Sequence, residues 1–280
     1  MTEVMGANME RSDIAVVILT LNESETIEHA ISSVGWSDDV FVVDSGSTDG
    51  TVEKASKLGA KVLVHRQDGP FLITEQRNWA VKNLPTEKPW VLFLDADELS
   101  TPEFVQAILD EINSNTRIDG LYAAPAFMYH GVWLRRCSGF PNWHPRAVRR
   151  GSGLRFTGGV WEEFTQGYPL SNVQVPYVHN TNAKGLTDWL EKHDRYAKWE
   201  ANMISEGVGR KSERRSLLRR LRYSLGALRK YFALIYLAIV RGGLLDGPEA
   251  RSYLKRMFIY ELLIDEHYRE MTHLRRGKGL

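Results

Sequence analysis

The sequence predicts an α/β fold built on a parallel, doubly wound sheet. Two observations carry this prediction. Short runs rich in Val, Ile, Leu and Phe, which are typical of strands buried on both faces, alternate with segments whose apolar residues recur at helical spacing. Several of these runs also end in polar residues, and open α/β sheets bind their ligands at the carboxyl ends of their strands.

The expected strands and helices follow one another in regular alternation. Strands are expected at 14–19, 39–43, 61–64 and 90–95, and helices at 25–34, 51–58 and 71–83. The motif Ser100-Thr101-Pro102-Glu103 then opens a helix over 102–112. Beyond it the pattern is mixed, with strand-like stretches at 120–129 and 175–180 and a helical pattern from residue 186.

Polar side chains gather at one edge of the expected sheet. They are Thr20, Asn22 and Glu23 after the first strand, Asp44 after the second, and Asp95 and Asp97 after the fourth. With Glu98, the fourth strand ends in three carboxylates, whose mutual repulsion a bound divalent cation would relieve. A solvated acidic turn is the alternative. No Gly-x-Gly-x-x-Gly follows the first strand and no Gly-x-x-x-x-Gly-Lys-Ser/Thr occurs, which disfavours dinucleotide binding and P-loop chemistry.

Composition indicates an ordinary globular protein in a reducing compartment. The 280 residues allow one large α/β domain with an appendage, and a net charge of +1 creates no field that demands a polyanionic partner. Cys137 is the only cysteine, so no disulfide framework is expected. Met1 to Ser12 lacks an apolar signal core, and no run of about 20 apolar residues occurs, so we expect a cytoplasmic protein.

Three motifs, in matching order and spacing, resemble family 2 glycosyltransferases of the GT-A fold. They are Leu19-Thr20-Leu21-Asn22-Glu23, Val43-Asp44-Ser45-Gly46-Ser47-Thr48-Asp49-Gly50-Thr51 and Asp95-Ala96-Asp97-Glu98. The likeness is greatest to the bacterial subgroup that adds sugars during assembly of the lipopolysaccharide core and of surface polysaccharides. The resemblance implies a Rossmann-like mixed sheet with flanking helices, a donor linked to UDP or GDP, and inversion at the anomeric carbon.

The resemblance also implies a set of donor-binding and metal-binding residues. Asp97 would be a direct ligand of Mg²⁺ or Mn²⁺, with His179 as a second ligand. Arg77 would lie near the base or diphosphate, where a fixed cation is suitable, and Asp95 near the ribose or a metal-bound water. For Asp49 we prefer a helix-capping role. The residues expected to bind the nucleotide sugar are Thr20, Leu21, Asn22, Glu23, Asp44, Arg77, Asp95, Ala96 and Arg146.

The segment Phe156-Thr157-Gly158-Gly159-Val160-Trp161-Glu162-Glu163 resembles the family's Val-His-Glu element, with Trp161 in place of the histidine. An inverting transfer needs a general base to take the proton of the acceptor hydroxyl. Register selects Glu162, with Glu163 as the fallback, and desolvation beside Trp161 would raise the pKa of Glu162. Surface glutamates on a strand are the alternative. Arg146 matches a family arginine and could bind a phosphate, whereas Arg149 and Arg150 are expected to be solvated.

The composition changes in the last third of the chain. Between residues 207 and 241 there are ten basic residues against one acidic residue, Glu213, and leucines interleave at helical spacing. Such a segment suits an anionic membrane surface, and the apolar run Tyr231–Val240 is too short to span a bilayer. Packing on the catalytic domain is the alternative. No nucleic-acid partner is expected, because stacking platforms and recognition-helix signatures are missing from the sequence.

Together these observations predict a flexible tail at 1–12, a GT-A catalytic domain at 13–205 and a basic amphipathic, membrane-associating helical segment at 206–280, which would contact the anionic surface through Arg210–Arg241. We expect a metal-dependent inverting glycosyltransferase, peripheral on the cytoplasmic face of the inner membrane. Its acceptor would be a lipid-linked saccharide in lipopolysaccharide or surface polysaccharide biosynthesis. One alternative is a sugar-phosphate nucleotidyltransferase, but Thr20–Glu23 does not resemble the Gly-rich loop of such enzymes. The other is a non-catalytic membrane adaptor built on a transferase fold.

Overall fold

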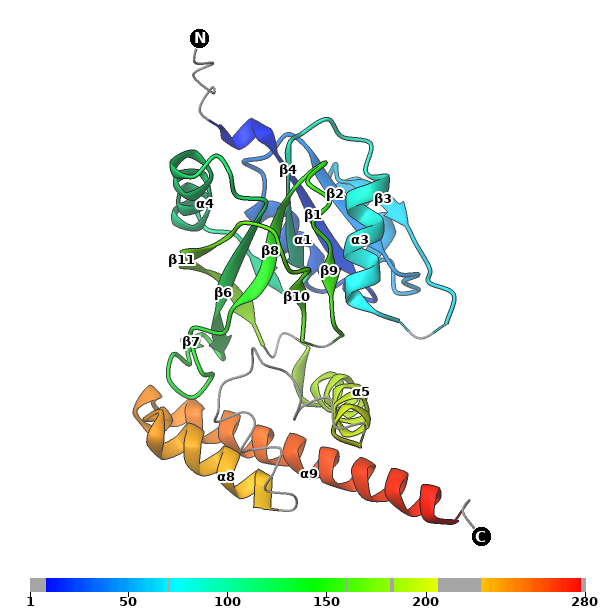
Figure 1. The fold of residues 1–280 in the computed structure, drawn as a ribbon, viewed down its shortest axis with the longest axis vertical. Coiled ribbons are helices and arrows are strands. Elements are labelled where there is room, and N and C mark those ends of the chain that lie inside the picture. The colour runs from blue at the N-terminus through cyan, green and yellow to red at the C-terminus, as the bar shows by residue number, and fades with distance from the viewer. Residues whose placement is uncertain (1–8, 70, 160, 182–183, 206–227, 278–280) are drawn as a thin grey trace. The chain divides into compact units, whose positions relative to one another are not determined.

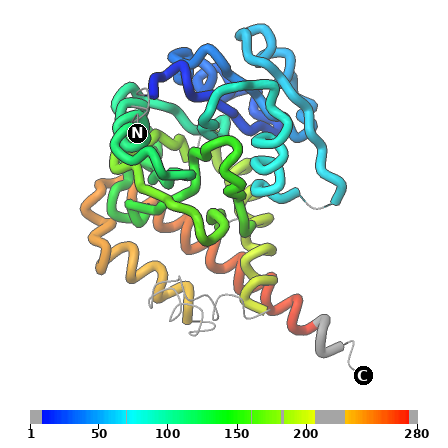
Figure 2. Tube along the Cα trace, turned by 45° about the horizontal axis from the view of Figure 1, so that its top comes forward, coloured from blue at the N-terminus to red at the C-terminus, as the bar shows by residue number. Residues whose placement is uncertain are grey.

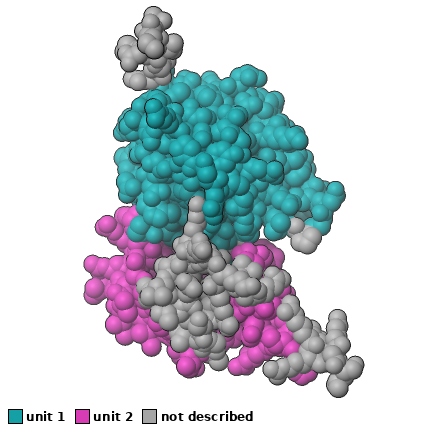
Figure 3. Space-filling model, viewed as in Figure 1, with its two compact units in different colours: residues 1–126, 141–183 teal, residues 127–140, 184–280 magenta. Residues whose placement is uncertain are grey.

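The computed structural model describes residues 9–69, 71–159, 161–181, 184–205 and 228–277. The chain divides into two compact units, coloured separately in Figure 3: residues 1–126 with 141–183, and residues 127–140 with 184–280. The sequence placed residues 185–205 in the catalytic domain, whereas the structure groups them with the second unit. The reason is that helix α5 (Gly185–Ser205) shares an apolar cluster with helix α9 (Pro248–Gly277).

A mixed sheet of nine strands is the main element of the fold. Its order is β3-β2-β1-β4-β8-β6-β11-β5, with β7 beside β6. Strands β1 to β4 pair in parallel and β8 joins β4 in the antiparallel sense, which confirms the mixed GT-A sheet and limits the purely parallel prediction to the first strands. The strands are β1 (Ile14–Thr20), β2 (Val40–Asp44), β3 (Lys61–Val64), β4 (Trp90–Asp95), β5 (Glu98–Leu99), β6 (Gly120–Tyr129), β7 (Val132–Trp133), β8 (His144–Arg149) and β11 (Leu170–Asn180).

Strand β1 is buried along its whole length because each of its faces meets a core. Alternate residues from Ile14 to Ile18 pack with α1 (Ile27–Ser33), α2 (Thr51–Lys57) and α4 (Pro102–Ser114). The residues between them pack with α3 (Ile73–Asn83) and the hairpin of β9 (Phe156–Thr157) and β10 (Glu163–Phe164). Figure 1 shows α3 and this hairpin on the near side of the strands. Burial on both faces explains why the run shows no polar alternation.

The strand registers bring three carboxyl ends level with one another. Thr20 at the end of β1 is paired with Asp44 at the end of β2, and Leu19 is paired with Asp95 at the end of β4. Figure 2 shows these first strands and the helices between them as the blue and cyan part of the tube. The polar residues that the sequence singled out therefore lie at one edge of the sheet.

The second unit is helical. It contains α5, α8 (Arg229–Ile235), the π-helical turn η3 (Tyr236–Val240), the 3-10 turn η4 (Gly243–Asp246), α9 and the excursion 127–140. One apolar cluster joins Tyr129, Leu134 and Cys137 of the excursion to Ala250 and Leu254 of α9. No helix in the described part of the chain has the length and apolar character needed to cross a membrane. Residues 206–227, which carry most of the predicted basic segment, and 1–8 of the predicted tail lie outside the described residues.

Candidate active site

Hydrogen bonds join the two loops that follow β1 and β2. Asn22 lies in the left-handed region, with φ of 57°, and its Oδ1 accepts from the backbone N–H of Thr48 at 2.9 Å. Its own N–H donates to Ser47 Oγ at 2.7 Å, and the N–H of Glu23 donates to Thr51 Oγ1 at 2.8 Å. Asparagine tolerates this backbone region better than most residues, so its type suits the turn.

Asp44 is fully buried beneath these loops. One carboxylate oxygen accepts from the hydroxyls of Thr20 at 2.8 Å and Ser47 at 2.5 Å, and the other accepts from the backbone N–H groups of Gly46 and Ser47. The carboxylate therefore shapes the loop from within. Its contact with a donor stays a prediction.

Asp49 holds the start of α2. Its Oδ1 accepts from the backbone N–H of Thr51 at 3.1 Å and from the Thr51 hydroxyl at 2.5 Å. Burial alone would raise the pKa of Asp49, but hydrogen bonds from Thr51 and Ser24 lower it to about 2. The carboxylate lies one residue before the N-cap position, Gly50, and is bonded to the first turn as a capping group would be.

The three carboxylates after β4 lie in different environments. The Asp95 side chain is 36% exposed, whereas Glu98 is fully buried. Asp97 Oδ2 lies 3.4 Å from His179 Nε2. His179 reaches this place because it is paired with Glu98 where β11 meets β5 in the antiparallel sense. A carboxylate and an imidazole thus come together from segments that are distant in the sequence.

Glu98 is the centre of a buried polar group. Its Oε1 accepts from Arg146 Nη2 at 2.6 Å, and the same nitrogen donates to the hydroxyl of Tyr177 at 2.7 Å. Its Oε2 accepts from the backbone N–H of Asp95 at 2.9 Å, which fixes the turn between the strands. Burial raises the pKa of Glu98 to about 7, against the opposing pull of the Arg146 guanidinium.

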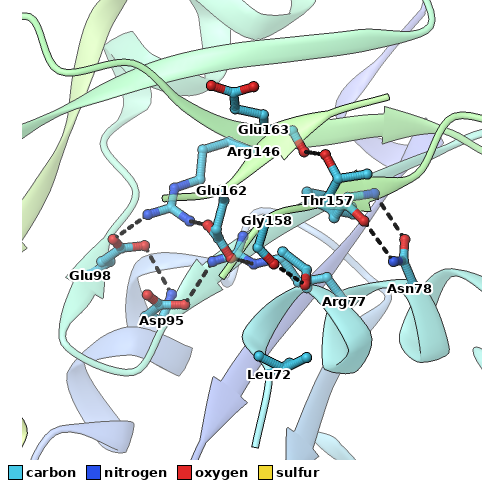
Figure 4. A network of polar contacts seen from close by, with 12 residues as sticks. Leu72, Arg77, Asn78, Asp95, Glu98, Arg146, Thr157, Gly158, Glu162 and Glu163 are labelled. Atoms are coloured by element: carbon cyan, nitrogen blue, oxygen red, sulfur yellow. Dashed lines mark hydrogen bonds and ion pairs between the residues drawn. The ribbon is translucent and has the colours of Figure 1, made fainter. Parts of the chain in front are cut away.

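Arg77 links the end of β4 to the β9–β10 hairpin. Its Nη2 donates to Asp95 Oδ1 at 3.1 Å, and its Nε lies 2.9 Å from Glu162 Oε1. Figure 4 shows the Glu162 carboxylate between the guanidinium groups of Arg77 and Arg146, with Arg146 Nη1 at 3.9 Å from Oε2. Burial raises the pKa of Glu162, and both arginines oppose that rise.

Several atoms in this network are buried without a hydrogen bond of good geometry. They include Arg77 Nε, Arg146 Nη1 and Glu162 Oε1. The 2.9 Å contact between Arg77 and Glu162 is therefore an ion pair whose atoms are poorly aligned for hydrogen bonding. Glu162 Oε1 therefore has lone-pair capacity for a further hydrogen bond.

The structure brings most of the predicted site residues to one region, in differing exposure. Arg77 and Arg146 are 1% and 4% exposed and hold carboxylates, so neither presents a free guanidinium to a phosphate at the surface. Glu163 points away from both arginines in Figure 4. Ala96 is buried and Leu21 is exposed in the loop after β1.

Glu98 and Tyr177 both contact Arg146 but are not among the binding or catalytic residues predicted from the sequence. The signal for Glu98 was present as the third carboxylate after the strand. Tyr177 gave no such signal, because its place beside Arg146 depends on the pairing of distant strands.

A divalent cation fits this site only if the bound substrate supplies further ligands to it. Among the described residues, no group of three or more His, Cys, Asp or Glu is arranged to hold a metal. Asp97 and His179 offer one carboxylate and one imidazole. Mg²⁺ commonly binds through one or two carboxylates together with substrate phosphates and water, so a pair of protein ligands suits a cation that arrives with a diphosphate.

Comparison with known proteins identifies related sequences. The family model described as glycosyl transferase family 2 matches residues 15–159. The uncharacterized glycosyltransferase RC0292 of Rickettsia conorii is 43% identical over 101 residues, which are 35% of this chain and 32% of that protein. Glycosyltransferase AglJ of Haloferax volcanii is 38% identical over 87 residues, 30% of this chain and 27% of that protein. The chain thus matches about a third or less of the length of these relatives.

One solved structure shares the fold over nearly the whole chain. The mannosyltransferase PcManGT of Pyrobaculum calidifontis, solved with GDP-Man and Mn²⁺, has a TM-score of 0.56 and covers 95% of this chain and 89% of its own. The two sequences are 16% identical. At that identity the likeness shows a common fold.

Proposed function

The chain belongs to glycosyl transferase family 2, and from this premise we propose that it transfers a sugar from a nucleotide-sugar donor to an acceptor hydroxyl with inversion at the anomeric carbon. One observation carries the proposal: Arg77 bridges Asp95, at the end of β4, and Glu162, on the β9–β10 hairpin. This bridge joins the edge where α/β sheets bind nucleotides to a buried carboxylate able to act as a base.

The donor is assigned to the loops that follow β1 and β2, together with the end of β4. The Asn22–Thr48 and Glu23–Thr51 hydrogen bonds hold the two loops as one surface, which supports this assignment. Asp97 and His179 would hold Mg²⁺ or Mn²⁺, which stabilises the charge of the departing nucleoside diphosphate when it is bound. That PcManGT was solved with GDP-Man and Mn²⁺ supports a GDP-linked donor and a divalent cation here.

Glu162 is assigned as the general base. Its carboxylate would take the acceptor hydroxyl's proton as that oxygen attacks the anomeric carbon, and the bond from this carbon to the diphosphate oxygen would break on the opposite side. Arg77 and Arg146 would position the carboxylate rather than touch the sugar, because both guanidinium groups are buried. The raised pKa of Glu162 favours proton uptake near neutral pH.

We also propose a lipid-linked saccharide acceptor, as in lipopolysaccharide or surface polysaccharide assembly, and a peripheral position on the cytoplasmic face of the bacterial inner membrane. Support comes from the basic composition of residues 207–241. Cationic segments of this kind gain about 1 kcal/mol per Lys or Arg at an anionic surface.

Calorimetric titration with GDP-mannose and with UDP-glucose, each with and without Mn²⁺, tests the donor site. We expect Mn²⁺ to strengthen binding of one donor, and Asp97→Asn to remove this metal dependence. Asp110→Asn, an exposed carboxylate on α4, is the matched control and should bind as the unchanged protein does. Metal-dependent binding that survives Asp97→Asn would contradict the metal assignment. Release of pyrophosphate instead of a nucleoside diphosphate would favour a nucleotidyltransferase.

A further inference from the structure

The second unit contains a cationic pocket that the proposed transfer does not use. Its volume is about 240 Å³, and it is lined by Arg135, Arg136, Phe140, Arg241 and Asp246. Arg135 and Arg136 are exposed, and Arg241 is half-buried. Three arginines and one aspartate thus line the pocket.

Short contacts lock the two chain segments that form this pocket. Asp246 Oδ2 accepts from the backbone N–H groups of Arg136 at 2.6 Å and Cys137 at 2.8 Å. Arg241 Nη2 donates to the Phe140 carbonyl at 2.5 Å. Gly243 packs so closely that a Cβ there would lie 2.5 Å from Cys137 Cβ. The pocket is therefore a preformed site rather than a chance meeting of surface side chains.

The pocket carries a positive charge suited to phosphate. Asp246 Oδ2 accepts hydrogen bonds from two backbone N–H groups, so this oxygen does not pair with the guanidinium groups of the arginines. Arg135 lies over the rings of Trp133 and Phe140, at 5.4 and 5.9 Å from their centroids, which restrains its guanidinium. Guanidinium groups bind phosphate oxygens in a bidentate manner, with more geometric specificity than ammonium groups.

An exposed apolar stripe runs into this pocket along the chain. Four of its residues recur at helical spacing from the residue before α8 to η3, one more ends η3 beside Arg241, and two lie within η4. Exposed apolar patches of this kind mark contacts with membranes or partners, and a neighbouring cationic group favours an anionic membrane. The stripe consists of Leu228, Tyr231, Ile235, Ile239, Val240, Leu244 and Leu245, which are 51% to 74% exposed.

We propose that the pocket of Arg135, Arg136 and Arg241 binds the phosphate of an anionic phospholipid while the apolar stripe enters the headgroup region of the bilayer. This inference rests on the proposed membrane position and gives it a defined site. Charge complementarity selects the occupant, because anionic lipids alone supply both a phosphate for the arginines and an apolar layer for the stripe.

Co-sedimentation of the full chain with vesicles tests the site. The vesicles contain phosphatidylcholine alone or mixed with phosphatidylglycerol, and we expect binding to the mixed vesicles only. The double variant Arg135→Gln/Arg136→Gln should weaken this binding about 30-fold, since each cation contributes about 1 kcal/mol. Arg117→Gln/Arg251→Gln removes the same charge at exposed positions outside the pocket and should change binding much less. Equal weakening by both pairs would overturn the site.

The apolar stripe is tested with a second pair of variants. Ile235→Gln/Ile239→Gln should weaken vesicle binding, whereas Leu186→Gln/Leu190→Gln, exposed at the same spacing on α5, should not. Thermal unfolding of each variant confirms that it is folded.

Titration with inorganic phosphate in the absence of vesicles separates the two possible sources of the anion. If free phosphate binds as tightly as the mixed vesicles do, the pocket is a site for soluble anions and the lipid assignment is overturned. The measurement uses no sugar donor, so Asp97→Asn should bind vesicles normally. Failure here therefore remains distinct from failure of the proposed transfer.

Discussion

At the level of single residues, Glu162 experiences opposing effects. Burial favours its protonated form, while Arg77 at 2.9 Å and Arg146 at 3.9 Å favour the carboxylate, and the balance leaves its pKa raised. A base needs this balance, because it must be ionised before the reaction and basic enough to take a proton during it.

Replacing Glu162 with glutamine should therefore lower kcat by about 10²- to 10⁴-fold with little change in donor affinity. The amide keeps the shape of the side chain but cannot take up the proton. Steady-state kinetics and donor titration measure the two effects separately. Glu163→Gln is the control, because its side chain points away from the arginines. Equal losses in both variants would contradict the assignment of the base.

The same balance sets the pH profile. Because the pKa of Glu162 is raised in the folded protein, kcat/KM should fall with decreasing pH at a higher pH than an exposed glutamate would give. Glu162→Gln should lose this limb from its residual activity.

At the level of elements, α5 has a pH-sensitive contact. His193 stacks on Trp189, with ring centroids 3.8 Å apart, and burial lowers its pKa from 6.5 to about 4. A lowered folded pKa means that the neutral imidazole is favoured, so stability is complete above pH 6.5 and is lost as the pH falls towards 4. At 1.36 kcal/mol per pH unit, the loss amounts to about 3 kcal/mol.

Urea unfolding at a series of pH values measures this loss. His193→Phe keeps an aromatic ring beside Trp189 and should flatten the dependence between pH 6.5 and 4. His29→Phe changes an exposed histidine on α1 and should leave the slope as it was. An unchanged slope in His193→Phe would assign the pH dependence to other groups.

Helix α8 is held by a buried cation. Arg229 is 3% exposed and lies within 3.7 Å of Glu200, 3.2 Å of Glu261 and 3.1 Å of Asp265. Arg229→Met should cost about 3 to 5 kcal/mol, because it removes the buried guanidinium that these three carboxylates share. Arg195→Met, at an exposed position on α5, should stay within about 0.5 kcal/mol of the original stability. Denaturant unfolding distinguishes the two.

The elements of the sheet were largely predictable, but some contacts were not. Strands such as those at 14–19 and 90–95 can be recognised in the sequence because they are apolar on both faces. Arg146 lies within β8, where Pro145 is located at an irregularity in the pairing with β6, so the N–H that proline lacks is not needed for a regular ladder. The Arg146–Glu98 pair joins residues 48 positions apart, and the local sequence pattern cannot predict a contact between such distant residues.

Over the whole molecule, the single cysteine reports on the second unit. Cys137 is fully buried, and burial is the main reason that its pKa is raised to about 12. Labelling by a thiol reagent at neutral pH should therefore be slow and should follow unfolding of that unit. Arg229→Met should accelerate the labelling and Arg195→Met should not. Fast labelling of the native protein would show that the thiol is accessible without unfolding.

The path of the chain has a consequence for inheritance and for protein engineering. The excursion 127–140 leaves the first unit, contributes Tyr129, Leu134 and Cys137 to the core of the second, and returns before the hairpin that carries Glu162. A chimera made with one crossover near residue 184 would combine residues 184–280 of a relative with residues 127–140 of this chain, although both segments belong to the second unit. Exchange of the second unit between relatives thus demands two coordinated breakpoints, so these two segments are expected to coevolve.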